Sequence, residues 1–545
     1  MARYGVAVLA GLLVGTSAAL VGPAEPAAAH AVLITADPAP GAVLGNAPDQ
    51  VVLTFSEPVR LVSGRSHVLA PNGKRITDGQ PQVSGNTVTI PIRPADRPLG
   101  TYLVSYRVIS ADSHPVGAGY TYSVGAPSAT APQVDPDGQQ LAVTVAVAVA
   151  KYLGYVGVVL AVGPALLLAW LWPPRLPRRP ALRLLRAGLA TVAAATVGAL
   201  WVQAPYTTGS GLFDVSPTDL AVVVGSGYGL AMLARLVLLA AVTVLITPAV
   251  TGTGGVRRGI ALVVLTLAAL VTWPMTGHAV AAPVPPVSIA ADTVHIAAVA
   301  VWIGGLVTLG GVLLRRAHPR VLARILPVWS RWAVVAVCWL LLAGTVQAVL
   351  ETGSLTALVT TRYGRLILTK VALVAGLLVV AGFARRLISR PDPALPRRLS
   401  ALVGVEVAVA TVALGISAVL VQTTPARTAV VQAQALGQDS FAQTLTSSLY
   451  TLQFDIYPVQ LGEYNTVHAY VYTPEGAPLE VVEWTLTTSL PAQGVEPVSV
   501  PLAGIEPNHA LGSVAFPVPG EWQLRFTLRV SDIDQATVVT TVTVD

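Results

Sequence analysis

The feature that most constrains this chain is an apolar block that runs from about residue 142 to residue 422. A helix needs about 20 apolar residues to cross the hydrocarbon layer of a bilayer, and the block holds about eight segments of that length. With 53% hydrophobic and 11% charged residues, the chain is too apolar for an ordinary soluble protein. The sequence therefore predicts a multidomain membrane protein with an eight-helix α transmembrane domain.

The basic residues of the block indicate its orientation. Arginines cluster after the first, third, fifth and seventh spans, and few Lys or Arg residues follow the even-numbered spans. Because positively charged loops stay in the cytoplasm, we expect a multi-pass plasma-membrane protein with both termini outside. The net charge of +6 then comes from the basic loops that set the membrane orientation. We therefore expect a lipid bilayer as a partner and no nucleic acid. We place the spans at about 142–172, 184–204, 226–250, 256–275, 288–314, 327–350, 363–384 and 399–421.

The residues before the block predict a secreted β domain. Residues 1–29 have a basic start, an apolar run and a small-residue end, as in a secretory signal peptide. Cleavage after Ala29 makes His30 the new N-terminus, whereas an uncleaved anchor leaves His30 in a linker. Residues 30–125 show short alternating segments typical of an antiparallel sandwich or barrel, and residues 126–141 read as a linker.

The residues after the transmembrane domain (142–424) predict a second β domain. Residues 425–445 are polar and read as a linker. Residues 446–545 show strand-like runs at regular spacing, which favours an immunoglobulin-like β-sandwich. We find no catalytic constellation there and expect no enzyme; a docking role for an extracytoplasmic protein partner is our expectation.

Sulfur ligands are almost absent. Cys338 is the only cysteine and lies within an apolar span, where we expect a buried thiol. The chain also has only three methionines, so thiolate sites and Met-rich sites for monovalent copper are excluded.

Asp112 and His114 form the first candidate metal site. Residues two apart in an extended segment face the same side, so both side chains can reach one point. A free His30 would add its α-amine and imidazole, and three nitrogens with a carboxylate suit divalent copper. Taken alone, the pair also fits a solvated strand end.

The motifs of this domain resemble the periplasmic copper-binding family CopC: HAVL at 30–33, DPAPG at 37–41, LTFSEPV at 53–59 and SADSHPV at 110–116. The resemblance implies a Cu(II) site at His30, Asp112 and His114. Glu57 matches a glutamate that adds an oxygen ligand in some members, although a polar residue at a strand end explains it equally well.

His278, Asp292 and His295 form the second candidate site. His278 lies at the predicted outer end of the fourth span, and Asp292 and His295 share one face of the fifth because they are three residues apart. Ionisable residues at membrane depth are functional candidates. A histidine near a helix end can also serve as a cap or bond a carbonyl group.

The order of motifs in the block resembles the copper-resistance CopD membrane family: TGHA at 276–279, DTVH at 292–295, WIGG at 302–305 and YGRLILTK at 363–370. The resemblance implies copper, of unspecified oxidation state, in the membrane domain. Arg235, Lys370 and Glu406 are further intramembrane charges, and pairing among them would lower their insertion cost. Trp302, Gly304 and Gly305 indicate close helix packing.

These features predict a membrane copper transporter that captures Cu(II) outside and passes it inward. Two alternatives stay open: copper tolerance by extracytoplasmic sequestration or export, and an assembly factor that metallates an exported copper enzyme. The remaining histidines lack partners at ligand spacing and are expected at the surface: His67, His318, His468 and His509.

Overall fold

The computed structural model describes residues 31–44, 46–95, 99–125, 128, 141–251, 256–388, 395–430, 441–457, 459–462, 464–474 and 477–544. The predicted signal peptide and His30 lie outside the described residues. The chain divides into two compact units, described separately below. One unit contains Ser110–Pro115 and the helices within Gln139–Val430, and the other contains the β strands on both sides of that region.

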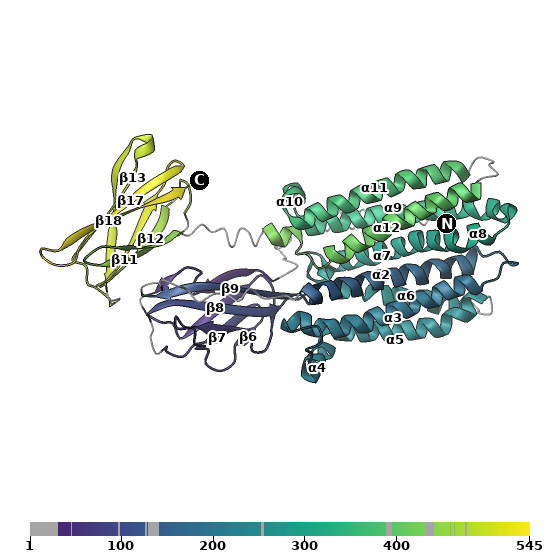
Figure 1. Ribbon diagram of the computed structural model, residues 1–545, viewed down its shortest axis with the longest axis horizontal. Coiled ribbons are helices and arrows are strands. Elements are labelled where there is room, and N and C mark those ends of the chain that lie inside the picture. Colours follow the sequence, from purple (N-terminus) through teal and green to yellow (C-terminus); the bar gives the residue numbers. More distant parts are fainter. Residues whose placement is uncertain are drawn as a thin grey trace. The chain divides into compact units, whose positions relative to one another are not determined.

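Eight helices in the described part of the chain are long and apolar enough to cross a membrane, which confirms the predicted number. They lie side by side as a bundle (Figure 1). The long helices are α2 (Leu141–Trp170), α3 (Arg179–Thr208), α5 (Gly227–Thr251), α6 (Val256–Val271), α7 (Pro285–Thr308), α9 (Pro319–Thr352), α11 (Arg362–Ile388) and α12 (Leu395–Leu420).

Several helix ends differ from the predicted spans. Helix α9 begins at Pro319, eight residues before the predicted boundary, because Pro suits a first turn and the His318 ring accepts a hydrogen bond from the Arg320 amide at 3.3 Å.

Cys338 is exposed on α9, so the prediction of a buried thiol is wrong. A helix that is apolar all round does not reveal from sequence which face packs.

Several short helical elements among the described residues were not predicted as separate elements, because they are too short for periodicity to resolve. The signal for α4 was nevertheless in the sequence, since Ser216 and Asp219 form a capping box around Pro217. The short elements are α4 (Pro217–Gly225), the 3-10 helices η1 (Pro274–Thr276) and η2 (His278–Ala281), the π-helical turn η3 (Leu309–Leu313), α8 (Leu314–Arg316) and α10 (Leu355–Thr360).

Glycines allow α2 and α7 to cross closely. A Cβ on Gly163 would lie 2.0 Å from the Gly304 carbonyl carbon, and one on Gly304 would lie 2.2 Å from the Val159 oxygen. Gly305 likewise faces the ring of Trp329, and Trp302 is buried. The predicted close packing around these residues is therefore confirmed, as expected for small residues between membrane helices.

The N-terminal β domain has two sheets, with strand orders β1-β3-β7-β6 and β2-β9-β8-β4, and β5 pairs with β8. Strand β3 alternates exposed and buried residues, so that Val51, Leu53 and Phe55 enter the core. The β domain expected from the alternation is confirmed. Its strands are β1 (Leu33–Asp37), β2 (Val43–Leu44), β3 (Gln50–Phe55), β4 (Arg60–Leu61), β5 (His67–Leu69), β6 (Gln82–Ser84), β7 (Thr87–Pro91), β8 (Gly100–Ile109) and β9 (Pro115–Val124).

The C-terminal β domain has a five-stranded antiparallel sheet, β10-β11-β12-β16-β15, and a four-stranded one, β14-β13-β17-β18. A C-terminal β domain built of antiparallel sheets, as predicted, is confirmed. Strand β10 begins within the segment predicted as a linker, because Phe441 and Leu445 pack against the core. The strands are β10 (Phe441–Thr446), β11 (Thr451–Tyr457), β12 (Tyr464–Tyr472), β13 (Glu483–Leu490), β14 (Val495–Val500), β15 (Leu502–Glu506), β16 (His509–Ala515), β17 (Gly520–Arg529) and β18 (Gln535–Val544); η4 (Pro491–Gln493) is a 3-10 turn.

Candidate metal centre

The connection Ser110–Pro115 fixes the Asp112 carboxylate by local hydrogen bonds. The Ser110 amide and hydroxyl both donate to the His114 carbonyl, at 2.9 and 3.0 Å. The Asp112 Oδ1 atom accepts from the His114 amide at 3.1 Å and from the Ser110 hydroxyl. Ser113 adopts the left-handed region with φ of 71°, which closes the turn. The second carboxylate oxygen, Oδ2, is thereby held toward the His114 ring.

Helix α3 anchors this connection. The buried Gln203 side chain donates through Nε2 to the Ser113 carbonyl at 3.0 Å. The His114 ring packs edge-on against Tyr206, with ring centroids 6.2 Å apart. Both anchoring residues lie near the C-terminal end of α3. The position of the loop within its unit is therefore set by specific contacts with the helices.

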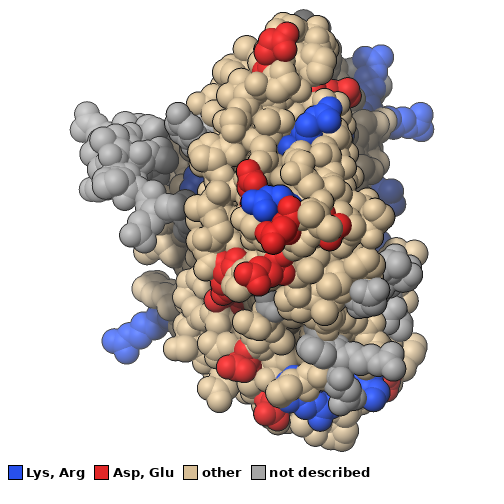
Figure 2. All heavy atoms as spheres, turned by 90° about the vertical axis from the view of Figure 1, so that its left-hand side faces the viewer, with Lys and Arg blue, Asp and Glu red and all other residues tan. Residues whose placement is uncertain are grey.

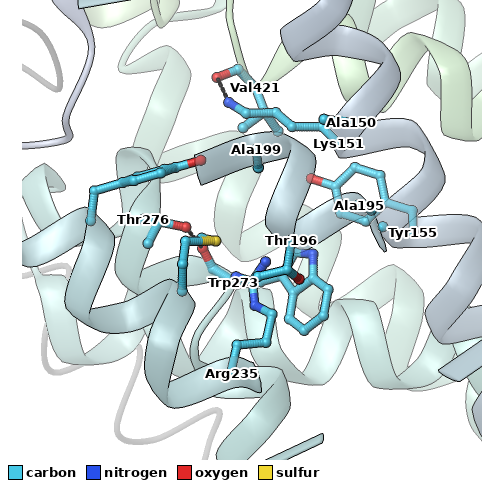
Figure 3. A pocket seen from close by; sticks show the side chains of 13 residues that line it. Ala150, Lys151, Tyr155, Ala195, Thr196, Ala199, Arg235, Trp273, Thr276 and Val421 are labelled. Atoms are coloured by element: carbon cyan, nitrogen blue, oxygen red, sulfur yellow. Dashed lines mark hydrogen bonds between the residues drawn. The ribbon is translucent and has the colours of Figure 1, made fainter. Parts of the chain in front are cut away.

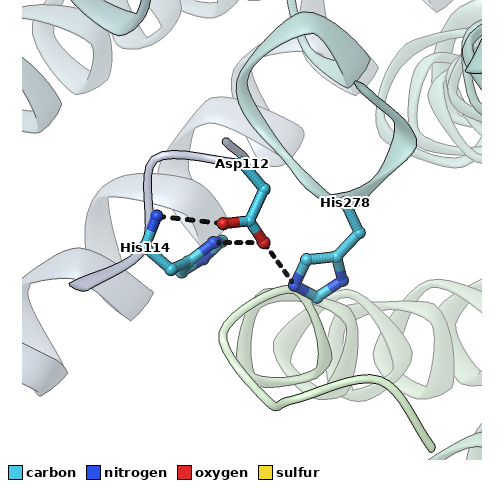
Figure 4. A group of neighbouring side chains, drawn as sticks. All are labelled: Asp112, His114 and His278. Atoms are coloured by element: carbon cyan, nitrogen blue, oxygen red, sulfur yellow. Dashed lines mark hydrogen bonds and ion pairs between the residues drawn. The ribbon is translucent and has the colours of Figure 1, made fainter. Parts of the chain in front are cut away.

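Asp112, His114 and His278 converge (Figure 4). Asp112 Oδ2 lies 3.0 Å from His114 Nδ1 and 3.8 Å from His278 Nε2. The three potential ligand atoms lie within 4.8 Å of one another, and all three residues are buried. The relative exposures are 1%, 4% and 8%, so bulk water does not separate them.

This donor set fits a divalent transition metal. Two imidazoles and a carboxylate are suitable ligands for copper or zinc, and the affinity order favours copper. Ligands bound at about 2.0 Å and at right angles lie about 2.8 Å apart, close to the observed separation of Asp112 and His114. His278 Nε2 would reach the same separation from Asp112 Oδ2 by approaching it by about 1 Å.

The structure groups the predicted ligands differently from the sequence. Asp112 and His114 were predicted to act with His30, which lies outside the described residues, and His278 was predicted to act with Asp292 and His295. Instead, His278 in η2 joins Asp112 and His114. Glu57 follows β3 and is not a member of this group of described residues.

Asp292 and His295 line a cavity of about 560 Å³ within the helix bundle, together with His278 and Lys370. Gln347 donates through Nε2 to Asp292 Oδ1 at 2.8 Å. Within the described residues, His295 Nδ1 is buried and has no hydrogen-bond partner. A Cβ on Gly344 would lie 3.3 Å from that nitrogen, so glycine leaves room beside it.

Sequence reasoning assigned no role to several polar residues of this cavity, among them Gln347, Glu351 and Tyr363. Glu351 is buried and interacts electrostatically with Asp292 and Asp112. Gln347 and Glu351 are four residues apart and therefore share a helix face. Their spacing at the end of an apolar span was the signal that could have identified them.

The three other intramembrane charges do not pair with one another among the described residues. Arg235 donates to the Thr272 hydroxyl at 2.8 Å and to the Thr272 carbonyl at 2.9 Å. Its guanidinium lies 3.7 Å from the centre of the Trp273 ring, and Figure 3 shows these two side chains together. Lys370 lines the large cavity. Glu406 is buried in α12, with 1% exposure. Arg235 is therefore stabilised by neutral groups.

Three family models match the chain in succession. The CopC domain matches residues 33–125, the N-terminal domain of copper resistance protein D-like proteins matches residues 141–283, and copper resistance protein D matches residues 323–420. The chain joins a CopC domain to a CopD-type membrane domain. The CopC model covers Asp112 and His114, and the D-like model covers His278. Asp292 and His295 lie between the two membrane-domain models.

Relatives of this CopC–CopD chain are copper proteins. The copper transport protein CutJ of Bacillus subtilis (strain 168) is 25% identical over 369 residues, covering 65% of this chain and 67% of CutJ. CopC from Methylosinus trichosporium OB3b is 24% identical, with 19% of this chain and 100% of that chain covered and a TM-score of 0.16. PcoC, a methionine-rich copper resistance protein from Escherichia coli, is 25% identical, with 17% and 98% covered and a TM-score of 0.15. The three family models and the match to CutJ confirm the predicted family resemblance.

Proposed function

We propose that this protein captures divalent copper outside the cell and passes it, through a centre formed by Asp112, His114 and His278, into the membrane cavity. The observation that supports this proposal is the convergence of the CopC-type Asp-x-His pair with a histidine of the membrane domain, within 4.8 Å. Copper held by the loop is already beside a ligand of the membrane unit, so transfer needs no diffusion of a separate donor.

The transfer is a sequence of ligand exchanges. His278 belongs to the outer centre and also lines the cavity that Asp292 and His295 line. Each exchange keeps copper bound to nitrogen and oxygen atoms, and His295 Nδ1 is oriented in the cavity with no competing hydrogen bond among the described residues. The tether between the two domains raises their effective concentration to roughly millimolar.

The test distinguishes copper binding at the outer centre from copper transport through the membrane domain. His278→Ala should weaken copper binding by the purified full-length protein and reduce copper accumulation by cells that express it. His295→Ala should reduce accumulation while leaving the outer centre intact. His318→Ala, at the exposed start of α9, is the matched control and should change neither.

Undiminished accumulation in both variants would contradict the proposal. The direction of transport is decided in the same cells, because loss of an importer lowers cellular copper, whereas loss of a tolerance protein increases sensitivity to copper. Loss of activity of an exported copper enzyme at unchanged total copper would favour the assembly-factor alternative.

A further inference from the structure

A pair of histidines in the C-terminal domain lies outside the proposed transport route. His468 is on β12 and His509 begins β16. Tyr470 pairs directly with His509, so His468, two residues away on the same strand, is a diagonal neighbour on the same face of the sheet. The alternate residues of β12, including Val467 and Ala469, enter the core. The prediction that His468 and His509 lack partners is therefore wrong.

The geometry of this pair resembles that of two ligands of one metal ion. His468 Nδ1 lies 3.2 Å from His509 Nε2. At a metal–nitrogen distance of about 2.0 Å, this separation corresponds to an angle of about 105° at the metal. That angle suits tetrahedral or tetragonal divalent ions, whereas a linear site for monovalent copper needs nitrogens about 4 Å apart.

Aromatic packing orients the two rings. Tyr470 stacks on His509 with centroids 4.0 Å apart and an angle of 16° between the planes, and it lies nearly parallel to His468 as well. His509 is only 8% exposed. Burial lowers the pKa of both histidines.

Two acidic residues lie opposite the pair in the sheet register. Asp455 lies opposite His468 on β11, and Glu506 lies opposite His509 on β15. The segment 446–545 contains eleven Asp and Glu residues and only two Arg, for a formal net charge of −9. The view in Figure 2 shows acidic side chains gathered on the face that it presents. A negative domain attracts cations to a site of neutral nitrogens.

We propose that His468 and His509 form a second metal site, which binds Cu(II) with Asp455 or Glu506 as an oxygen donor. The site goes beyond the transport route, and only the choice of copper as the metal rests on the proposed function. A bound ion would replace the hydrogen bond between the two rings. The C-terminal domain would then be a copper-binding module in its own right.

The test is a titration of the full-length protein in detergent with copper sulfate. Substitutions His468→Gln and His509→Gln are made together in the wild-type chain and in a chain that already carries His114→Gln and His278→Gln. We expect the pair of substitutions to remove about one copper per chain in both backgrounds, together with a nitrogen-coupled electron paramagnetic resonance signal. His318→Gln is the control and should remove none.

The two backgrounds separate this site from the proposed transport centre. If the centre at His114 and His278 fails to bind copper, the substitutions His468→Gln and His509→Gln still reduce the amount of copper bound per chain. Unchanged stoichiometry and spectra in both backgrounds would overturn the second site and leave the pair as a structural hydrogen bond.

A second measurement uses the wild-type protein, so its result does not depend on whether the variants fold. Diethyl pyrocarbonate modifies accessible imidazoles, and mass spectrometry of the peptide that contains His468 reports its reactivity. We expect one equivalent of copper sulfate beyond saturation of the first centre to protect His468 at least threefold. Equal reactivity with and without copper would overturn the proposal.

Discussion

At the scale of single residues, the candidate centre depends on side chains that hold the ligands without contacting the metal position. The Ser110 hydroxyl and the His114 amide fix one oxygen of Asp112, which leaves the other toward the two imidazoles. Gln203 then joins the loop to α3. Outer partners of this kind orient ligands and commonly change metal affinity by about 10- to 100-fold.

Replacement of Gln203 tests this dependence. Gln203→Leu removes the donor to the Ser113 carbonyl and leaves Asp112, His114 and His278 in place. Because the loop then loses its anchor, we expect copper affinity to fall about tenfold. The measurement is a copper titration of the full-length protein against a competing chelator. The control is Gln422→Leu, at a glutamine two residues after the end of α12. An unchanged affinity for Gln203→Leu would show that the loop holds its position without the anchor.

His67 gives the N-terminal domain a dependence on pH. Its Nδ1 atom is buried and, within the described residues, has no hydrogen-bond partner. Burial, followed by the charges of Arg75 and Arg65, lowers its pKa below the ordinary 6.5. Below pH 6.5 the unfolded chain therefore binds more protons at this position than the folded one, and stability falls as the pH decreases.

We expect His67→Gln to reduce the loss of stability on acidification. The thermal midpoint of the N-terminal domain should decrease between pH 7.5 and pH 5.5 in both proteins, and the decrease in the variant should be smaller by about 1–3 °C. The difference is small because solvent screens the charge of a partly exposed ring. Scanning calorimetry of the full chain measures this difference. Equal decreases in the two proteins would mean that His67 does not contribute to it.

At the scale of elements, contacts between glycines determine how the helices that carry the ligands pack. Helix α7 carries Asp292 and His295, and its Gly304 lies against Val159 and Gly163 of α2. Only backbone atoms occupy the position where a Cβ would lie, so no side chain can move aside to make room. The position of the cavity ligands therefore depends on this crossing.

Gly304→Ala should destabilise the protein by about 2 kcal/mol, because overpacking at a tight contact costs about 1–3 kcal/mol. The thermal midpoint of the purified protein in detergent, followed by tryptophan fluorescence, measures the effect. Gly198→Ala on α3 is the matched control: nothing lies within 4 Å of its added Cβ, and alanine favours helix. Equal midpoints for the two variants would argue against the crossing as a source of stability.

At the scale of the whole molecule, the sequence predicts what depends on local pattern. Long apolar runs identify eight spans, alternation identifies strands such as β3 and β17, and the SADSHPV motif identifies Asp112 and His114. It does not predict contacts that unite distant segments. His278 reaches Asp112 through the placement of a loop, and His468 reaches His509 through strand register, so neither pairing leaves a periodic signal.

The orientation in the membrane is the prediction on which external capture depends. Arginine clusters, such as Arg315 and Arg316 after the fifth span, should hold alternate loops in the cytoplasm, and an even number of spans then places both β domains outside. Cys338 is exposed on α9, so Cys338→Ser provides the background for single-cysteine variants. The chosen positions are Asn72→Cys, Asp532→Cys and Arg316→Cys, all at exposed residues.

A membrane-impermeant thiol reagent applied to intact cells should label the cysteines at positions 72 and 532 and should label position 316 only after the membrane is disrupted. The cost of moving several arginines across the bilayer, about 2.5–3.5 kcal/mol each on insertion scales, opposes the inverted form. Labelling of position 316 alone in intact cells would show that the protein has the opposite orientation in the membrane. The CopC domain would then face the cytoplasm, and copper would be captured inside the cell, as an exporter requires.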